Sequence, residues 1–373
     1  MLHTALFLLL ASLPPVSAGV QAATETLKVQ ISTSAIRDLV LAERVVRGIH
    51  LTCWGAGSAK TRKELIKKIS GSVINTVVIA IKETDGKVYI PGVEKANRFG
   101  SHQNAITDPA AMIKDFKAAG LYTVARIVVF KDKVVPKVRH DLAVRTPDGG
   151  LWRSHNGATW VDPYSREVWD YNLDIAELCA KLGFDEIQFD YIRYPSEGNT
   201  SLCRYSKPHD RRTATRNLRD FLDHARKRLT PYKVKISADV FGLTTTVKDD
   251  MGIGQDIKAL AAGADYVYPM MYPSHYAPGE YKLKNPNRSP FKVINRGLKD
   301  AMAKLGPDYA RLRPYLQDFS MGWTYGPSEV RAQLMATRLN LLESWVLWNA
   351  GNKYTWAALT PQSYRAFVDP EYK

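Results

Sequence analysis

The residues best suited to chemistry lie together in one stretch, GFDEIQFDYIRYP, from Gly183 to Pro195. Apolar and polar residues alternate in its first half, which indicates a short strand, and alternate side chains of a strand share a face. Glu186, Gln188 and Asp190 are therefore predicted to share one face, with Asp190 at the carboxyl end. A carboxylate there, followed closely by Arg193, indicates the rim of an active site. The alternative is a strand-end aspartate held in a structural ion pair.

A second carboxylate, Asp239, lies near the end of the predicted strand 234–241. Hydrolysis of a glycosidic bond uses two carboxyl groups that flank the bond, one protonated and one ionised. We assign Asp190 as the nucleophile or base and Asp239 as the acid. A basic neighbour, Arg126 or Arg193, is expected to lower the pKa of Asp190 and to keep it ionised. The alternative for Asp239 is a strand-end residue that caps a loop.

Strand-like and helical segments alternate along the chain, which predicts a single-domain α/β protein, a (β/α)8 TIM barrel with long βα loops. An open doubly wound sheet is disfavoured because no G-x-G-x-x-G or phosphate-binding loop follows the first strand. The predicted barrel occupies residues 46–356, between a lead-in at 23–45, with weak helical character at 36–45, and a tail at 357–373. The predicted strands are 48–51, 73–81, 121–130, 184–190, 234–241, 265–271, 312–319 and 345–348, and the predicted helices are 59–69, 109–120, 163–182 (capped by Asp162), 213–229, 257–263, 291–305 and 328–341.

In a barrel the active site lies at the carboxyl ends of the strands. The residues predicted there combine carboxylates, amides and aromatic planes. Sugars need aromatic faces for their C–H surfaces and polar groups for their hydroxyls, so this mixture favours a carbohydrate ligand. The predicted substrate-binding residues are Trp54, Lys82, Arg126, Gln188, Tyr191, Arg193, Tyr272, His275, Gln317, Asp318, Trp348 and Asn349.

Other chemistries find less support in the sequence. The eight histidines are scattered without an H-E-x-x-H motif, and no G-x-S-x-G motif occurs, so neither a zinc protease nor a serine hydrolase is predicted. No metal site and no cofactor is predicted. The spacing of the three cysteines fits no zinc motif. A disulfide between Cys179 and Cys203 is one possible arrangement, in which Cys53 is a buried free thiol.

The net charge of +15 attracts polyanions, and no nucleic-acid-binding motif accompanies it. A basic surface without a particular partner is the alternative. With the rim residues above, the expected partner is a polysaccharide or oligosaccharide, an anionic one included, and not nucleic acid. Residues 5–13 form an apolar run that ends at Pro14-Pro15, and small residues follow at Ala18 and Ala22. This pattern resembles a secretory signal peptide over residues 1–22, too short for a permanent membrane span. It predicts an extracytoplasmic protein, periplasmic or secreted, without a stable membrane span.

Seven segments together resemble a bacterial family of “putative glycoside hydrolase” domains, a TIM-barrel family of unknown function akin to the alpha-amylase clan. The matching segments are GFDEIQFDYIRYPSEG at 183–198, VARIVVFKD at 124–132, WVDPYSREVWDYN at 160–172, ISADVFG at 236–242, YPMMYPSHY at 268–276, RPYLQDF at 313–319 and WVLWNAGNKY at 345–354.

The resemblance implies a barrel, a carbohydrate substrate, a nucleophile at Asp190 and an acid at Asp239, where the clan has Glu. One position departs from the family, which usually has Asp two residues before Lys82; this chain has Ala80. The expected function is a glycoside hydrolase that cleaves an envelope or exported polysaccharide. Two alternatives remain: a catalytically inactive carbohydrate-binding barrel of the cell wall or envelope, and a basic wall-associated scaffold without a pocket.

Overall fold

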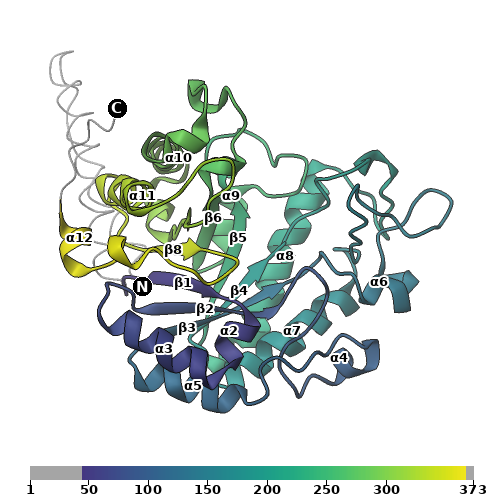
Figure 1. The fold of residues 1–373 in the computed structure, drawn as a ribbon. Coiled ribbons are helices and arrows are strands. Elements are labelled where there is room, and N and C mark those ends of the chain that lie inside the picture. The colour runs from purple at the N-terminus through teal and green to yellow at the C-terminus, as the bar shows by residue number, and fades with distance from the viewer. Residues whose placement is uncertain (1–43, 367–373) are drawn as a thin grey trace, which may run out of the picture.

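A computed structural model describes residues 44–366, in which eight parallel strands close into a barrel surrounded by helices (Figure 1). Each strand pairs with the next along the chain, and the last pairs with the first. The predicted (β/α)8 barrel is therefore confirmed. The strands are β1 (Arg47–Leu51), β2 (Thr76–Lys82), β3 (Tyr122–Val128), β4 (Glu186–Asp190), β5 (Lys235–Phe241), β6 (Tyr266–Met271), β7 (Tyr315–Gln317) and β8 (Trp345–Trp348).

Helices follow the strands along the chain and cover the outside of the barrel. The helices are α2 (Cys53–Gly57), α3 (Ala59–Ser70), α4 (Glu94–Phe99), α5 (Pro109–Ala118), α6 (Val135–Val138), α7 (Arg166–Lys181), α8 (Arg211–Leu229), α9 (Ile257–Gly263), α10 (Pro290–Leu305), α11 (Pro327–Leu339) and α12 (Pro361–Arg365). Within residues 44–366, no helix is both long and apolar enough to cross a bilayer. The predicted signal peptide and most of the predicted lead-in and its helix lie outside the described residues.

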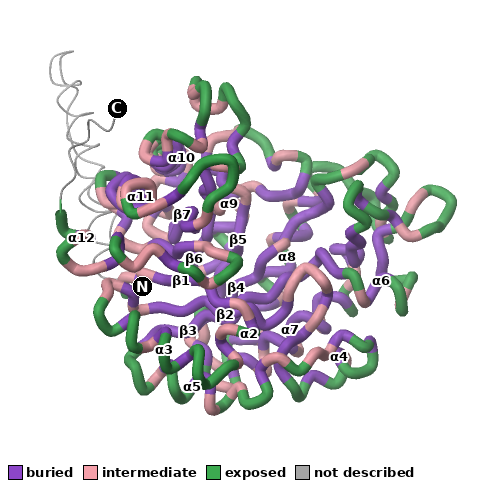
Figure 2. The backbone as a smooth tube through the Cα atoms, viewed as in Figure 1, coloured by how far each residue is buried: buried purple, intermediate pink, exposed green. Residues whose placement is uncertain are grey.

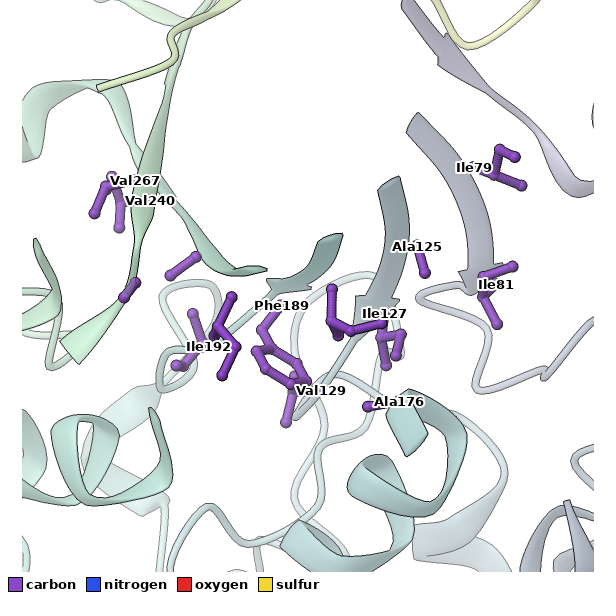
Figure 3. Close-up of a cluster of buried hydrophobic side chains, with 14 of the residues drawn as sticks. Ile79, Ile81, Ala125, Ile127, Val129, Ala176, Phe189, Ile192, Val240 and Val267 are labelled. Carbon is purple, nitrogen blue, oxygen red and sulfur yellow. The ribbon is translucent and has the colours of Figure 1, made fainter. Parts of the chain in front are cut away.

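The outward faces of the strands form the main core with the helices. Ile127 and Phe189 point away from the barrel axis and meet α7 and its neighbours (Figure 3). The strands are buried on both sides (Figure 2), as their near-continuous apolar sequences predict. Because side chains alternate along a strand, the residues between these apolar ones must point into the barrel.

The inside of the barrel is unusually rich in tyrosine and contains a buried ion pair near its amino-terminal end. Glu186, fully buried on β4, accepts hydrogen bonds from the hydroxyls of Tyr122 (3.0 Å) and Tyr268 (2.8 Å) and from Nη1 of Arg313 (2.7 Å). The guanidinium of Arg313 also lies 3.2 Å from the centre of the Tyr266 ring. We call these residues the lower network. Both oxygens of the Glu186 carboxylate accept hydrogen bonds, as a buried charge requires.

Three long loops follow β2, β3 and β4, as predicted, and they extend the side of the barrel near α6 (Figure 1). The loops after β3 and β4 are joined by two backbone hydrogen bonds between Arg145 and Arg204. Asp162 also joins them, because its carboxylate accepts from the backbone N–H of Tyr164 and of Ser206. The predicted helix cap at Asp162 is therefore wrong: α7 is capped by Ser165.

The cysteines do not form the bridge considered above, since all three are free and buried. Cys179 lies near the end of α7, which runs antiparallel to the strands and so ends at the amino-terminal side of the barrel. Cys203 lies in the loop after β4, at the opposite side. The architecture thus separates the two thiols.

Candidate active site

A cavity of about 400 Å³ opens at the carboxyl ends of the strands, where the barrel fold predicts the active site. It contains both predicted catalytic aspartates. Its walls combine aromatic rings, two methionines and charged groups. The lining residues are Arg126, Asp190, Tyr191, Arg193, Glu197, Asp239, Phe241, Gly242, Leu243, Met251, Met270, Tyr272, His275, Tyr276, Tyr315 and Trp348.

Asp190 is held in place by an arginine and by the backbone. Its Oδ2 accepts from Nε of Arg126 (2.9 Å) and from Nη2 of the same side chain. Its Oδ1 accepts from the N–H of Tyr191 (2.6 Å), a residue with a positive φ of 50°. Of the two arginines considered from the sequence, Arg126 is therefore the ion-pair partner. These donors favour the ionised carboxylate.

Asp239 is in the opposite situation, although it lies beside the same arginine. Nε of Arg126 lies 3.8 Å from Oδ2 of Asp239, and neither carboxylate oxygen has a hydrogen-bond partner. Burial raises the pKa of Asp239 well above 3.8, the negative charge of Asp190 raises it further, and Arg126 opposes both. Asp239 therefore holds a proton at pH values at which an ordinary aspartate has lost it.

Arg126 connects the two carboxylates to the wall of the cavity. Its Nη1 donates to Glu83 (2.6 Å), and its guanidinium lies 4.9 Å from the centre of the Trp348 ring. His50 stacks on the same indole, with ring centres 3.8 Å apart. Burial, and then Arg126, lower the pKa of His50 well below 6.5, so its imidazole is neutral. Of these planar groups, Arg126 and Trp348 line the cavity, and an indole is a group that sugar rings contact.

Of the twelve predicted substrate-binding residues, the structure places six in the cavity lining. These are Arg126, Tyr191, Arg193, Tyr272, His275 and Trp348. Tyr272 packs against both His275 and Trp348, with ring centres 5.4 and 6.5 Å apart. The aromatic wall therefore joins the ends of β6 and β8.

Lys82 is not in the cavity. A register irregularity between Ala80 and Lys82 interrupts the alternation of β2, so the side chain of Lys82 leaves the barrel. Its Nζ lies 2.9 Å from Oδ2 of Asp132 and donates to Oδ1 of Asn172 on α7 (3.2 Å). Lys82 is fully buried there, which makes it a structural residue. Ala80 pairs with Arg126 in register and adds no polar group to the site.

The other five predicted residues lie outside the cavity lining. Gln188 accepts from the Tyr315 hydroxyl inside the barrel, and Trp54 lies on α2 with 55% of its surface exposed. The remaining three fix loops around the rim. Gln317 accepts from the N–H of Ser274, Asp318 accepts from the N–H and hydroxyl of Thr355, and Asn349 donates to the carbonyls of Asp318 and Lys353.

Several lining residues escaped the sequence argument. Tyr315, Met270 and Phe241 each lie two positions from a predicted site residue on the same strand, so the period of two could have identified them. Leu243, Met251, Tyr276 and Glu197 lie on connections, where no such period exists. Within residues 44–366, no group of three or more His, Cys, Asp and Glu side chains could hold a metal ion.

Comparison with solved structures finds the same barrel in several carbohydrate-active proteins. The glycoside hydrolase domain of PgaB (BpsB) from Bordetella bronchiseptica aligns with a TM-score of 0.65 and 14% identity, over 86% of this chain and 97% of that one. Alpha-L-fucosidase isoenzyme 2 from Paenibacillus thiaminolyticus gives 0.60 and 11%, over 86% and 49%. An alpha-galactosidase from Thermus thermophilus gives 0.53 and 12%, over 86% and 60%. At these identities the likeness shows the fold.

The family assignment comes from the sequence itself. No curated protein matches the chain. A family model described as “Putative glycosyl hydrolase domain” matches residues 48–354, from the first strand of the barrel to the segment after the last. That range includes both aspartates and every residue that lines the cavity. The chain therefore belongs to this family of glycosyl hydrolase-like barrels.

Proposed function

We propose that this protein is a glycoside hydrolase in which Asp190 is the nucleophile and Asp239 is the acid. The observation that carries the proposal is the unequal surroundings of two adjacent carboxyl groups. Asp190 accepts from a guanidinium and a backbone N–H, whereas the buried oxygens of Asp239 accept from nothing. Two carboxyl groups whose surroundings favour opposite protonation states are what glycosidic cleavage requires.

The chemistry runs in two balanced steps. Asp239 gives its proton to the glycosidic oxygen as the bond from that oxygen to the anomeric carbon breaks, and Oδ1 of Asp190 bonds to that carbon. Oδ1 has a lone pair available because only the N–H of Tyr191 occupies it. Water then attacks the anomeric carbon and releases Asp190, while Asp239 takes the proton of the water and is restored.

A nucleophilic Asp190 implies retention of the anomeric configuration, and the distances to Arg126 limit how far apart the two carboxyl groups lie. Nε of Arg126 lies 2.9 Å from Oδ2 of Asp190 and 3.8 Å from Oδ2 of Asp239. The sum of these distances is the largest separation that the two oxygens can have. This bound lies near the limit between retaining enzymes, about 5–5.5 Å, and inverting enzymes, about 6.5–9.5 Å, so the configuration of the released sugar is the measurement that decides.

The proposed substrate is an envelope or exported polysaccharide, cleaved outside the cytoplasm. The cavity volume of about 400 Å³ and its aromatic wall suit a sugar unit. The signal-peptide-like segment at residues 1–22 supports an extracytoplasmic location.

The test is release of reducing ends from a panel of neutral and acidic envelope glycans. Asp190→Asn should lower turnover by on the order of 10⁴-fold while leaving the fold intact, since removal of a nucleophile is among the largest single effects in hydrolases. Asp220→Asn, an exposed change on α8, is the matched control and should keep wild-type turnover. An Asp190→Asn variant as active as the wild type would refute the assignment.

A second candidate is a carbohydrate-binding barrel without catalysis. It is favoured by Ala80, which faces the barrel interior beside Arg126 without adding a functional group. It predicts that glycans of the panel bind to the wild type and that no product forms on any of them. Steady release of reducing ends by the wild type excludes this candidate.

A further inference from the structure

The cavity contains two buried arginines whose surroundings differ. Arg126 forms ion pairs with Glu83 and Asp190. Arg193 is 3% exposed and forms no ion pair within residues 44–366. Its Nη1 donates to the carbonyl of Tyr194 and to the hydroxyl of Ser196, both at 3.0 Å. All its hydrogen-bond partners are therefore neutral.

Aromatic rings surround the remainder of the Arg193 guanidinium. Its central carbon lies 4.9 Å from the centre of the Trp160 ring, 4.8 Å from that of Tyr191 and 4.6 Å from that of Phe241. These contacts orient the group and stabilise it modestly, by about 0.5–2 kcal/mol for a cation over a ring. They do not neutralise its charge.

A second cation without a carboxylate partner lies at the same tyrosine. Nζ of Lys131 lies 5.1 Å from the centre of the Tyr191 ring, and Lys131 is 8% exposed. Neither Lys131 nor Arg193 forms an ion pair within the described chain. The nearby acidic residue that lines the cavity, Glu197, is exposed, and Asp190 is already bonded to Arg126.

Burial acts on both cations in the same direction. Desolvation lowers the pKa of Arg193 and of Lys131. Tyr191, Asp190 and Glu197 offset this only in part at Arg193, and Glu197 and Asp190 do so at Lys131. A buried charge without a counter-ion is unfavourable, and a guanidinium satisfies a carboxylate or sulfate through two parallel hydrogen bonds. No carboxylate is bonded to Arg193, and because Arg193 lines the cavity an anion can reach it from there. Lys131 does not line the cavity and adds positive charge at the same Tyr191 ring.

We propose that Arg193, assisted by Lys131, binds an acidic substituent, a carboxylate or a sulfate, on the sugar unit that occupies the cavity. The substrate class is then an acidic polysaccharide, such as one that contains uronic acid or sulfated units. This inference rests on the proposed function, because it takes the cavity as the sugar site. The net charge of +15 agrees with an anionic polymer as partner.

The test measures binding and not turnover, so that it gives an answer even if no hydrolysis is found. Dissociation constants for glucuronate, glucose 6-sulfate and glucose are measured by calorimetry on the full chain at low ionic strength. The wild type should bind at least one of the two acidic sugars at least 10-fold more tightly than glucose. Comparison of glucuronate with the sulfate identifies which acidic group the site prefers.

Arg193→Gln should reduce the preference for the acidic sugar to less than about 3-fold, and Arg193→Lys should retain part of it. Lys131→Gln, which leaves the contacts of Arg193 with Tyr194 and Ser196 intact, should reduce the preference by a smaller factor. Arg216→Gln removes the same charge from an exposed position on α8 and should not change the preference. Thermal unfolding of each variant confirms that it is folded.

A wild type that binds neither acidic sugar better than glucose would overturn the proposal. So would a preference that survives in both Arg193→Gln and Lys131→Gln. These outcomes are distinguishable from failure of the proposed hydrolase, which would appear as absent reducing-end release whatever the sugar preference is.

Discussion

The inner face of β4 contributes to two buried arginine–carboxylate sites whose bonding differs. At the lower network, Glu186 accepts from Arg313 and from two tyrosine hydroxyls. Four residues further along the strand, Asp190 accepts from Arg126, but the neighbouring Asp239 accepts from nothing. At the lower site both oxygens of Glu186 are hydrogen-bonded, although Tyr122, Tyr266 and Arg313 line a second cavity at that end of the barrel. At the upper site the unbonded Asp239 lines a cavity of about 400 Å³.

The comparison shows how one scaffold separates stability from chemistry. The oxygens of the buried Glu186 already accept hydrogen bonds from the protein, so this carboxylate is not available to a ligand and the lower network stabilises the barrel. A buried carboxyl group without partners is costly, and proteins retain such groups mainly where function needs them. If this interpretation is right, equivalent mutations at the two sites should affect different measurements.

The largest effect is expected at the upper site. Asp239→Asn removes the proposed general acid, so kcat should fall by about 10²–10⁴-fold on a substrate with a poor leaving group. At about pH 4 the free energy of unfolding should change little, because an amide replaces a protonated carboxyl group of the same shape; at higher pH the variant should be the more stable protein, because only the wild-type carboxyl group ionises on unfolding. Turnover and urea unfolding of the same preparation check both points. Unchanged turnover would remove Asp239 from the mechanism.

The next largest effect is expected at the lower network. Glu186→Gln leaves Arg313 buried without its carboxylate, which should lower the free energy of unfolding by about 3–5 kcal/mol. Turnover per folded molecule should stay within a few-fold of the wild type. Urea unfolding measures the loss, and Glu64→Gln, an exposed change on α3, is the control. A variant that loses activity without losing stability would contradict the separation of roles.

Removal of single tyrosine hydroxyls gives a smaller and graded effect. Tyr122→Phe deletes one donor to the Glu186 carboxylate and should cost about 1.5–3 kcal/mol of unfolding free energy, as for hydrogen bonds to charged groups. Tyr315→Phe deletes a donor to the neutral amide of Gln188 and should cost about 0.5–1.5 kcal/mol. Equal losses in the two variants would show that the charge of Glu186 adds nothing to the lower network.

A further difference between the two sites is a slope in the pH dependence of stability. Because the pKa of Asp239 is raised in the folded state, the folded protein holds a proton that the unfolded chain releases above about pH 4. Unfolding free energy should therefore fall as the pH rises from about 4 through the folded-state pKa, by at most about 1.4 kcal/mol per pH unit. Asp239→Asn should lack this contribution, and parallel curves for variant and wild type between pH 4 and 8 would disprove it.

The sequence predicted the barrel well because its signals are local. The apolar runs of the strands, the glycines and capping residues at helix ends, and the alternation of Glu186, Gln188 and Asp190 each depend on a few neighbouring residues. Eight such units can close in few ways. The same local rule predicted that Glu186, Gln188 and Asp190 share one face, but it left open whether Arg126 or Arg193 pairs with Asp190.

The errors occur at residues whose side-chain position depends on contacts with a segment that is distant in the sequence. Lys82 leaves the barrel because of a strand irregularity and because Asp132 and Asn172 bind it. Asp162 precedes a proline, which predicted a helix cap, but its carboxylate joins two loops instead. Asp318 and Asn349 fix rim segments, although a strand-end polar residue could equally have faced a ligand. Sequence alone does not separate these cases, because it does not show which loops meet.

The donor to Oδ1 of Asp190 belongs to the main chain at Tyr191, where φ is 50°. Exchange of the side chain at this position leaves that N–H in place; only proline deletes the donor, and proline cannot adopt a positive φ. The tyrosine ring, by contrast, lines the cavity and lies beside Arg193 and Lys131. Related barrels could therefore carry another residue at this position, and so bind another sugar, while the hydrogen bond that orients Asp190 is kept. Glycine, asparagine and aspartate are the substitutions that a positive φ tolerates best.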